Sequence, residues 1–206
     1  MSFATNKFSK ELGGPKPTAK DGLDLPAAPM AQWKNYKKDI KPGWYRDQFF
    51  YLFGSGVQRY ERCLDAWKFL LPKKASFAML GRNAYGSILV LQNGENEVGG
   101  QIGVLDTTVV QYTSNTDWMF PTLFSQLLPD RVLDVFSDDS AYQKWNAAAK
   151  TQKSKLEDDM ILGIKKPLPV GGTMAASNFI VADLFEYYET TADVYRKAHG
   201  AATGAH

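Results

Sequence analysis

Apolar residues recur at helical spacing in several parts of the chain. One set precedes Pro72, which would end a helix, and consists of Val57, Tyr60, Leu64, Trp67 and Leu71. A second set consists of Phe120, Leu123, Phe124, Leu127 and Leu128. A third set follows the capping sequence Asp138-Asp139-Ser140 and consists of Tyr142, Trp145, Ala149 and Leu156. Amphipathic helices are therefore expected in these three segments.

The longest helix is expected near the C-terminus. Ser177 or Asn178 would cap its first turn, and Gly200 would end it. Residues 201–206 would form a disordered tail. The buried face of the helix would hold Ile180, Leu184, Tyr187, Thr191, Val194 and Ala198.

Extended segments are expected before and between these helices. Residues 44–53 combine aromatic and polar side chains and are predicted to form a strand. Residues 75–113 predict three or four more strands, with a hairpin signal at Asn93-Gly94. The unbroken apolar run from Ile88 to Leu91 indicates a strand covered on both faces. The predicted fold class is α+β, with a mostly antiparallel sheet, flanking helices and a helical C-terminal part.

Composition and charge narrow the class of protein. The chain has 206 residues, of which 44% are hydrophobic, and a net charge of +2. No apolar run is long enough to span a membrane, and the N-terminus lacks the apolar stretch of a secretory signal, so a cytoplasmic protein without a membrane partner is expected. Residues 1–41 hold eight Lys and four acidic residues, and the remainder is faintly acidic. Residues 1–29 would form an extended basic lead-in.

Side chains that carry out covalent chemistry are scarce. Cys63 is the single cysteine, and its place beside the first helical stripe predicts a buried structural thiol. The two histidines, His199 and His206, both lie in the last eight residues. A catalytic site built on histidine, or a metal site built on His and Cys, is therefore not expected. No cofactor is expected either.

A Gly-Gly pair near the last helix raises the question of a phosphate-binding loop. Such a loop carries its lysine after the final glycine, whereas Lys165 and Lys166 precede Gly171 and Gly172. Pro167 favours extended backbone before it, and the two glycines permit a sharp reversal. The segment is therefore predicted to be a structural turn into the last helix.

Acidic residues form two clusters, Asp138-Asp139 and Glu157-Asp158-Asp159. Paired carboxylates can carry out acid–base catalysis or bind Mg²⁺, so a magnesium-dependent enzyme is one hypothesis. Neighbouring carboxylates on a helix point in different directions, however, which favours a solvated or capping role. The sequence favours a protein with no bound metal and no catalytic activity.

Two stretches resemble a known family. Residues 80–91, LGRNAYGSILVL, resemble the strand-turn-strand signature of GAD-like domains. Residues 156–172, LEDDMILGIKKPLPVGG, resemble the C-terminal domain of type VI secretion immunity proteins formerly grouped as DUF1851. The resemblance implies a GAD-like part over residues 30–114 and a DUF1851-type domain over residues 115–200. Besides Leu168, it is carried by residues that are also predicted to form structural turns: Gly81, Gly86, Pro167, Gly171 and Gly172.

The family resemblance implies a function. Such a protein would bind and neutralise a cognate type VI secretion toxin, a DNase, by covering its active site or DNA-binding groove. The toxin-binding groups would be the acidic residues Asp138, Asp139, Glu157, Asp158 and Asp159, which suit a DNA-binding partner. An alternative is a regulator that contacts the promoter DNA of its own operon, alone or with the toxin, through the basic residues Lys34, Lys37, Lys38 and Lys41.

Overall fold

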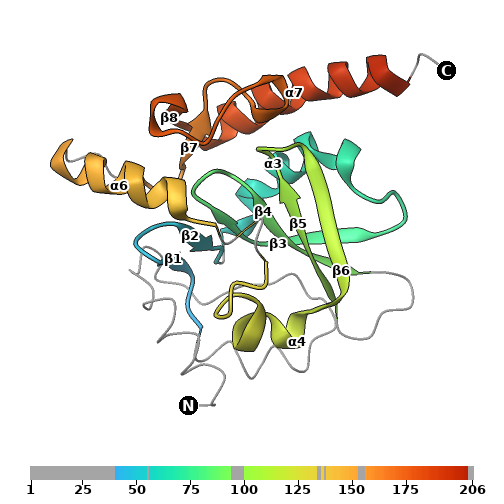
Figure 1. Ribbon diagram of the computed structural model, residues 1–206. Helices are drawn as coiled ribbons and strands as arrows, with labels where there is room; N and C mark the ends of the chain where they lie inside the picture. Colours follow the sequence, from blue (N-terminus) through green and yellow to red (C-terminus); the bar gives the residue numbers. More distant parts are fainter. Residues whose placement is uncertain are drawn as a thin grey trace.

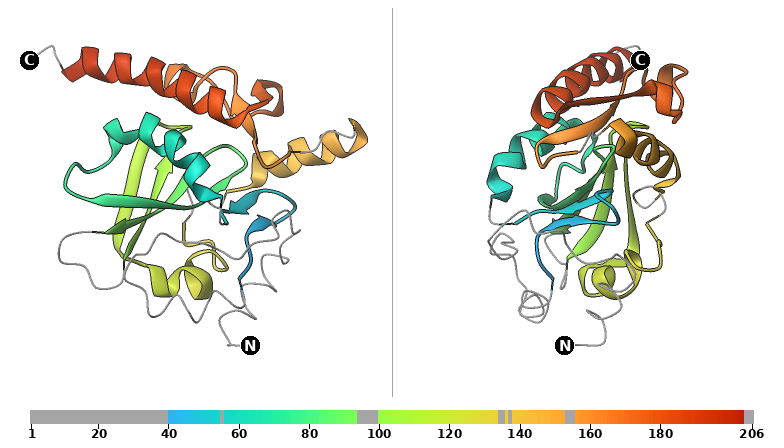
Figure 2. Two further views of the ribbon diagram at one scale, coloured as in Figure 1. Left: turned by 180° about the vertical axis from the view of Figure 1, so that it is seen from behind. Right: turned by 90° about the vertical axis from the view of Figure 1, so that its left-hand side faces the viewer.

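The computed structural model describes residues 40–54, 56–93, 100–133, 136, 138–152 and 156–203. Six strands form one antiparallel sheet and two more form a separate hairpin, with helices packed around both (Figure 1). Figure 2 shows the long helix α7 at one end of the molecule and α4 at the opposite end. The predicted α+β class with a mostly antiparallel sheet is confirmed. No helix in the described part is both long and apolar enough to cross a bilayer.

The six-stranded sheet is a meander, in which each strand pairs antiparallel with the next along the chain. Its strands are β1 Gly43–Tyr45, β2 Phe50–Leu52, β3 Ser76–Asn83, β4 Ile88–Asn93, β5 Gln101–Asp106 and β6 Gln111–Met119. The single strand predicted over residues 44–53 is wrong, because a turn divides it into the hairpin β1–β2. The turn is formed by the polar triplet Arg46, Asp47 and Gln48, which lies between two groups of aromatic residues, so the segment does not alternate as a single strand would.

Strand β4 lies at the centre of the core. Ile88, Leu89, Val90 and Leu91 have no exposed surface. Because successive side chains of a strand point to opposite faces, burial of all four requires cover on both faces. The two-sided burial predicted for this run is confirmed. The hairpin expected at Asn93-Gly94 reaches beyond the described residues at Gly94.

The first predicted helix consists of three short elements: η1 Val57–Tyr60, α3 Glu61–Ala66 and η2 Lys68–Leu70. All five residues of its apolar stripe are buried, which confirms the predicted face. Cys63 is also fully buried, as a structural thiol should be. Loss of water around the sulfur raises the pKa of Cys63 to about 12, so the thiol stays protonated at neutral pH.

The next two predicted helices are present. α4 Phe120–Thr122 continues as the π-helical segment η3 Leu123–Leu127, and all five predicted apolar residues of this segment are buried. α6 spans Ser140–Gln152, begins at the expected acidic cap and buries Tyr142. Leu156 is buried too, but it lies in the chain beyond the helix.

The C-terminal part begins with a second sheet, made of β7 Met160–Ile164 and β8 Phe179–Asp183. Two 3-10 turns, η4 Leu168–Val170 and η5 Ala176–Asn178, lie in the loop between these strands. Helix α7 Leu184–Thr203 follows β8 directly. The predicted caps Ser177 and Asn178 are therefore wrong, because β8 intervenes. The Asp183 carboxylate caps α7 instead, and accepts the N–H groups of Phe185 and Glu186.

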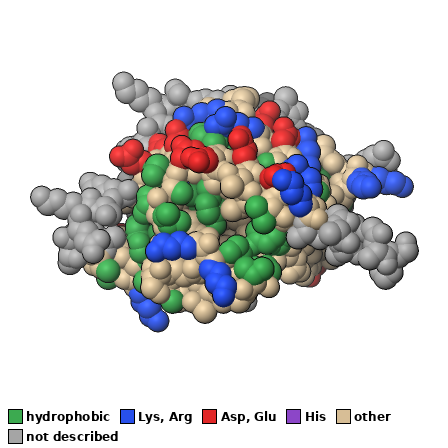
Figure 3. Space-filling model, turned by 90° about the horizontal axis from the view of Figure 1, so that it is seen from above, with side chains coloured by type: hydrophobic (Ala, Val, Ile, Leu, Met, Phe, Trp, Pro, Cys, Tyr) green, Lys and Arg blue, Asp and Glu red, His purple; other side chains and the backbone are tan. Residues whose placement is uncertain are grey.

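The buried face of α7 differs from the prediction. It carries Leu184, Tyr188 and Ala192, and the Tyr188 hydroxyl donates to the carbonyl of Gly86. Ile180 and Val194, which were expected inside, are 45% and 59% exposed. Figure 3 looks down on this end of the molecule and shows hydrophobic side chains at the surface. Leu184 is buried as predicted, but the buried positions continue from it at intervals of four residues, through Tyr188 and Ala192. Ile180 lies in a strand and does not belong to the helix at all.

Helix α7 also continues past its predicted end. Gly200 lies inside it, and residues 201–203 of the expected disordered tail are helical. Residues 204–206 lie outside the described residues.

The Gly-Gly segment forms a turn, as predicted, but it joins β7 to β8 instead of leading into the helix. Gly171 has a left-handed φ of +84°, which suits glycine. A Cβ on Gly172 would collide with the Lys166 carbonyl oxygen. The Asn178 amide closes the loop by donating to the carbonyl oxygens of Lys166 and Thr173.

The two glycines of the LGRNAYG stretch have different roles. Gly86 has a φ of +93° in the turn between β3 and β4, so the predicted turn is confirmed. Gly81 does not form a turn, because it lies inside β3. A Cβ at that position would come within 2.6 Å of the Tyr51 carbonyl oxygen, so the absence of a side chain lets β2 approach β3.

One of the expected domain limits falls inside a strand. Strand β6 runs through the expected boundary between residues 114 and 115, so that boundary does not coincide with the end of a strand. The lead-in of residues 1–29 lies outside the described residues. Of the four lysines assigned to DNA contact, only Lys41 falls within the described part.

Candidate functional site

The turn of the β1–β2 hairpin has an uncommon backbone. Arg46, Asp47 and Gln48 have φ values of 49°, 53° and 70°, all in the left-handed region. For residues other than glycine this conformation costs roughly 1–2 kcal/mol each. Two side-chain hydrogen bonds to later parts of the chain hold the turn: the Tyr142 hydroxyl donates to the Asp47 carbonyl at 2.7 Å, and the Gln48 amide donates to the Leu156 carbonyl at 3.3 Å. Tertiary contacts therefore offset the strain.

The first acidic cluster lies on one side of this turn. Arg46 Nη2 is 2.6 Å from Asp139 Oδ2, in an ion pair whose side chains are only 10% and 11% exposed. Burial lowers the pKa of Arg46, and the negative charge of Asp139 opposes that shift. Arg131 reaches the other carboxylate oxygen at 3.8 Å. Asp139 therefore has a structural role at the start of α6.

Asp138 caps the same helix. Its Oδ1 accepts the N–H of Ser140 at 2.9 Å. This hydrogen bond holds the pKa of Asp138 below its ordinary value, because it stabilises the charged carboxylate. Both carboxylates of the first cluster are thus committed to contacts within the molecule.

The second acidic cluster lines an open groove on the other side of the turn. The cavity has a volume of about 420 Å³. Glu157 is exposed, and Asp158 and Asp159 are half-buried. The lining residues, called the acidic groove below, are Trp44, Gln48, Arg59, Leu156, Glu157, Asp158 and Asp159.

Aromatic side chains from the β1–β2 hairpin hold the Asp158 carboxylate. Trp44 Nε1 donates to Oδ1 at 2.9 Å, and the Tyr51 hydroxyl donates to Oδ2 at 3.4 Å. The Trp44 and Tyr51 rings pack edge to face with their centroids 5.0 Å apart. Because both rings are buried, the carboxylate has little freedom to rotate.

The Asp159 carboxylate makes a bidentate pair with Arg59. Arg59 Nη1 lies 2.9 Å from Oδ2, and Nη2 lies 2.7 Å from Oδ1. The Tyr60 hydroxyl also donates to Oδ1, at 2.8 Å. Burial of the ring raises the pKa of Tyr60 well above its ordinary value, and the hydrogen bond to the negatively charged Asp159 adds a smaller shift in the same direction. The pair is open to solvent, with side chains 52% and 40% exposed.

A buried arginine supports the groove from beneath. Arg82 on β3 is fully buried, and its Nη2 donates to the carbonyl oxygens of Asp158 and Met160, each at 2.8 Å. Its guanidinium lies 4.9 Å from the centre of the Trp44 ring. Loss of water lowers the pKa of Arg82. Arg82 therefore fixes the backbone of the acidic cluster against the six-stranded sheet.

The arrangement suits recognition of a cationic group. Three successive residues present carboxylates at the groove, and Arg59 balances the charge of one of them, so the lining keeps a net negative charge. The predicted binding residues are not gathered into one site, because Glu157, Asp158 and Asp159 line the groove and Asp138 and Asp139 do not. Across the described ranges, no three Asp, Glu, His or Cys side chains come together as a metal ion would require.

Inspection of the sequence found the acids but missed their partners. Trp44, Gln48 and Arg59 line the groove, and Arg46 and Arg82 hold the two clusters in place. One signal was available: Arg82 follows the apolar stretch from Phe77 to Leu80 in a predicted strand, and a charged residue buried in such a place needs internal partners. The partners of Arg46 and Arg59 carried no comparable signal, because they lie 93 and 100 residues further along the chain.

No family model and no curated protein matches the sequence. Among solved structures, the chain is similar to one described as the crystal structure of Atu4351 from Agrobacterium tumefaciens. The similarity covers 90% of this chain and 87% of that chain, with a TM-score of 0.54 and 14% sequence identity. At this identity the likeness extends to the fold alone.

Proposed function

We propose that the chain is an immunity protein, which binds a cognate type VI secretion toxin with DNase activity and blocks its active site or DNA-binding groove. It would act in the cytoplasm by binding alone, without chemistry of its own. The observation that carries the proposal is the acidic groove, where Glu157, Asp158 and Asp159 stand together on a rigid frame.

The charge of the groove fits such a partner. A protein that binds DNA presents Lys and Arg side chains to the phosphates, and an acidic surface on an inhibitor complements them. Complementary charge also speeds the encounter of the two proteins. Glu157 and Arg59 are exposed and the Asp159 side chain is 40% exposed, so all three are available for contact.

The rigidity of the groove supports binding as well. Trp44 and Tyr51 hold Asp158, and Arg59 and Tyr60 hold Asp159, before any partner arrives. A surface that is ordered in advance loses less conformational entropy on association. The first cluster is less suited to contact a partner, because Asp139 is only 8% exposed.

The test uses the purified full-length chain and the nuclease encoded by the adjacent gene. We expect the chain to bind this nuclease and to stop plasmid cleavage at equimolar amounts. Glu157→Lys should weaken binding at least tenfold, because it places a positive charge opposite a basic surface, at an exposed position where folding is not at stake. Isothermal titration calorimetry measures the affinity.

Asp117→Lys is the matched control. Asp117 is also exposed and undergoes the same change of charge, but it lies on β6, at the opposite edge of the sheet from β1. An equal loss of affinity in both variants would contradict a role for the groove. If the nuclease remains fully active when the chain is added in molar excess, the proposed function is overturned.

A further inference from the structure

The outer edge of strand β3 is only half covered. Strand β2 pairs with its last three residues, from Gly81 to Asn83, and the Phe53 N–H donates to the Leu80 carbonyl at 3.0 Å. Residues 76–79 pair with β4 on the inner side. In the described part of the chain, no strand lies along their outer side.

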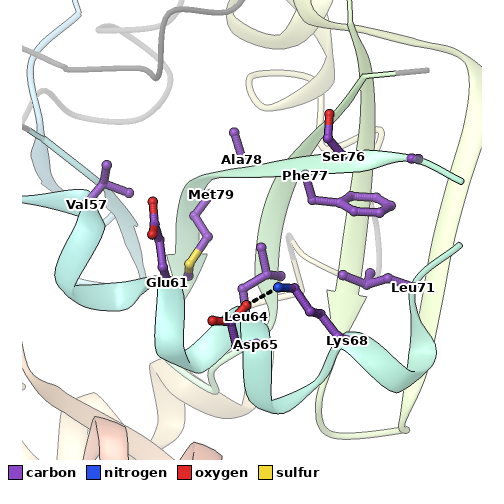
Figure 4. A pocket seen from close by; sticks show the side chains of 11 residues that line it. Val57, Glu61, Leu64, Asp65, Lys68, Leu71, Ser76, Phe77, Ala78 and Met79 are labelled. Atoms are coloured by element: carbon purple, nitrogen blue, oxygen red, sulfur yellow. Dashed lines mark ion pairs between the residues drawn. The ribbon is translucent and has the colours of Figure 1, made fainter. Parts of the chain in front are cut away.

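The edge is open because the chain leaves the sheet just after β2. The Gly54 carbonyl accepts the N–H of Val57 at 3.0 Å, which turns the backbone into η1 and then into α3. Helix α3 consequently lies beside residues 76–79 of β3, without a strand of this chain between them (Figure 4).

A groove of about 420 Å³ runs between α3 and this edge, and is called the β3 groove below. Phe77 and Met79 project from the strand toward the helix (Figure 4). Leu64 and Leu71 contribute apolar surface from the helical side. Glu61 is exposed beside them, so the mainly apolar groove carries a negative charge at its mouth.

The other two charged residues at the groove do not change its net negative charge. Asp65 and Lys68 form an ion pair with each other, three residues apart on the same helical segment. Their charges cancel, and Glu61 supplies the net charge of the lining. An occupant with a basic side chain near Glu61 would be complementary to the site.

We propose that the β3 groove binds an extended segment of a partner protein, which adds an antiparallel or parallel strand to residues 76–79. An open strand edge offers a row of backbone donors and acceptors, and a helix beside it forms pockets for every second side chain. The bound segment has apolar residues at alternate positions, directed toward Phe77 and Met79, and a Lys or Arg near Glu61. This inference does not depend on the acidic groove.

The test screens a displayed library of random ten-residue peptides against the purified full-length chain. We expect enrichment of peptides with alternating apolar residues and at least one Lys or Arg. A synthetic version of the strongest binder should shift the amide NMR signals of residues 76–79. Methylation of backbone nitrogens along one edge of this peptide should weaken binding at least tenfold, while methylation along the other edge leaves it unchanged, because only one edge faces β3.

A charge variant tests the mouth of the groove. Glu61→Lys should weaken binding of the basic peptide at least fivefold, whereas Asp117→Lys, an equal change on exposed β6, and Glu157→Lys in the acidic groove should not. The proposal is overturned if no peptide is enriched or if the NMR shifts map elsewhere. It is also overturned if both methylated edges behave alike, or if sedimentation shows that a second copy of the chain occupies the edge.

Discussion

The two acidic clusters look alike in the sequence, yet the fold uses them differently. In the first cluster, the side chains of Arg46 and Asp139 are 10% and 11% exposed. In the second, those of Arg59 and Asp159 are 52% and 40% exposed. Both are short arginine–carboxylate pairs, and the difference between them is access to water. Burial therefore separates a structural ion pair from one that is available to a partner.

The largest expected effect comes from breaking the buried pair. Asp139→Ala leaves the charge of Arg46 buried, with Arg131 as a further positive charge nearby. Removal of one member of a buried pair costs about 3 kcal/mol of unfolding free energy. Urea denaturation followed by circular dichroism measures this loss. A loss below about 1 kcal/mol would contradict the structural role of this pair and would remove the contrast between the clusters.

A smaller effect is expected from the exposed pair. Asp159→Ala removes the carboxylate that Arg59 and the Tyr60 hydroxyl contact, but the exposed Arg59 can turn to water, and its Nη2 still donates to the buried Tyr60 hydroxyl at 2.6 Å. The expected cost is about 0.5–1 kcal/mol, as for other exposed pairs. In 1 M NaCl, where the screening length is about 3 Å, this cost should shrink while that of Asp139→Ala persists. Equal salt dependence of the two variants would contradict the distinction.

The smallest effect is expected at the cap of α6. Asp138→Asn keeps an oxygen acceptor for the Ser140 N–H and removes only the charge, so the expected loss at pH 7 is below about 0.5 kcal/mol. Because folding lowers the pKa of Asp138, the stability it contributes is present above its ordinary pKa and is lost as pH falls through the lowered folded value. The difference between wild type and variant should therefore vanish in acid. A difference that grows below pH 3.8 would refute this assignment.

Long or strictly periodic patterns allowed correct predictions. The run from Ile88 to Leu91 identified the central strand, and the stripe from Val57 to Leu71 identified a buried helical face. In both cases the apolar side chains of one element are buried in the core that this element packs against. The prediction depended only on the period of the side chains along one element.

The C-terminal part shows where this reasoning failed. The apolar run from Phe179 to Ala182 fits a helix as well as a strand, and its pairing with β7 decided the matter. The helix then began at Leu184, and its buried face shifted to include Tyr188. A short apolar run does not identify its own partner, so the pairing had to come from tertiary structure.

By itself, the sequence of this protein determined its α+β class, its central strand, the turn at Gly171 and the positions of its acidic residues, because these depend on side-chain period and on local backbone preference. Only the tertiary structure decided which carboxylates are buried and which line a groove. These acidic residues are contacted by arginines that lie far from them in the sequence: Arg46 by 93 residues, Arg59 by 100 and Arg82 by 76. Contacts over such distances follow from packing of the whole chain, and the pattern of a single segment does not encode them.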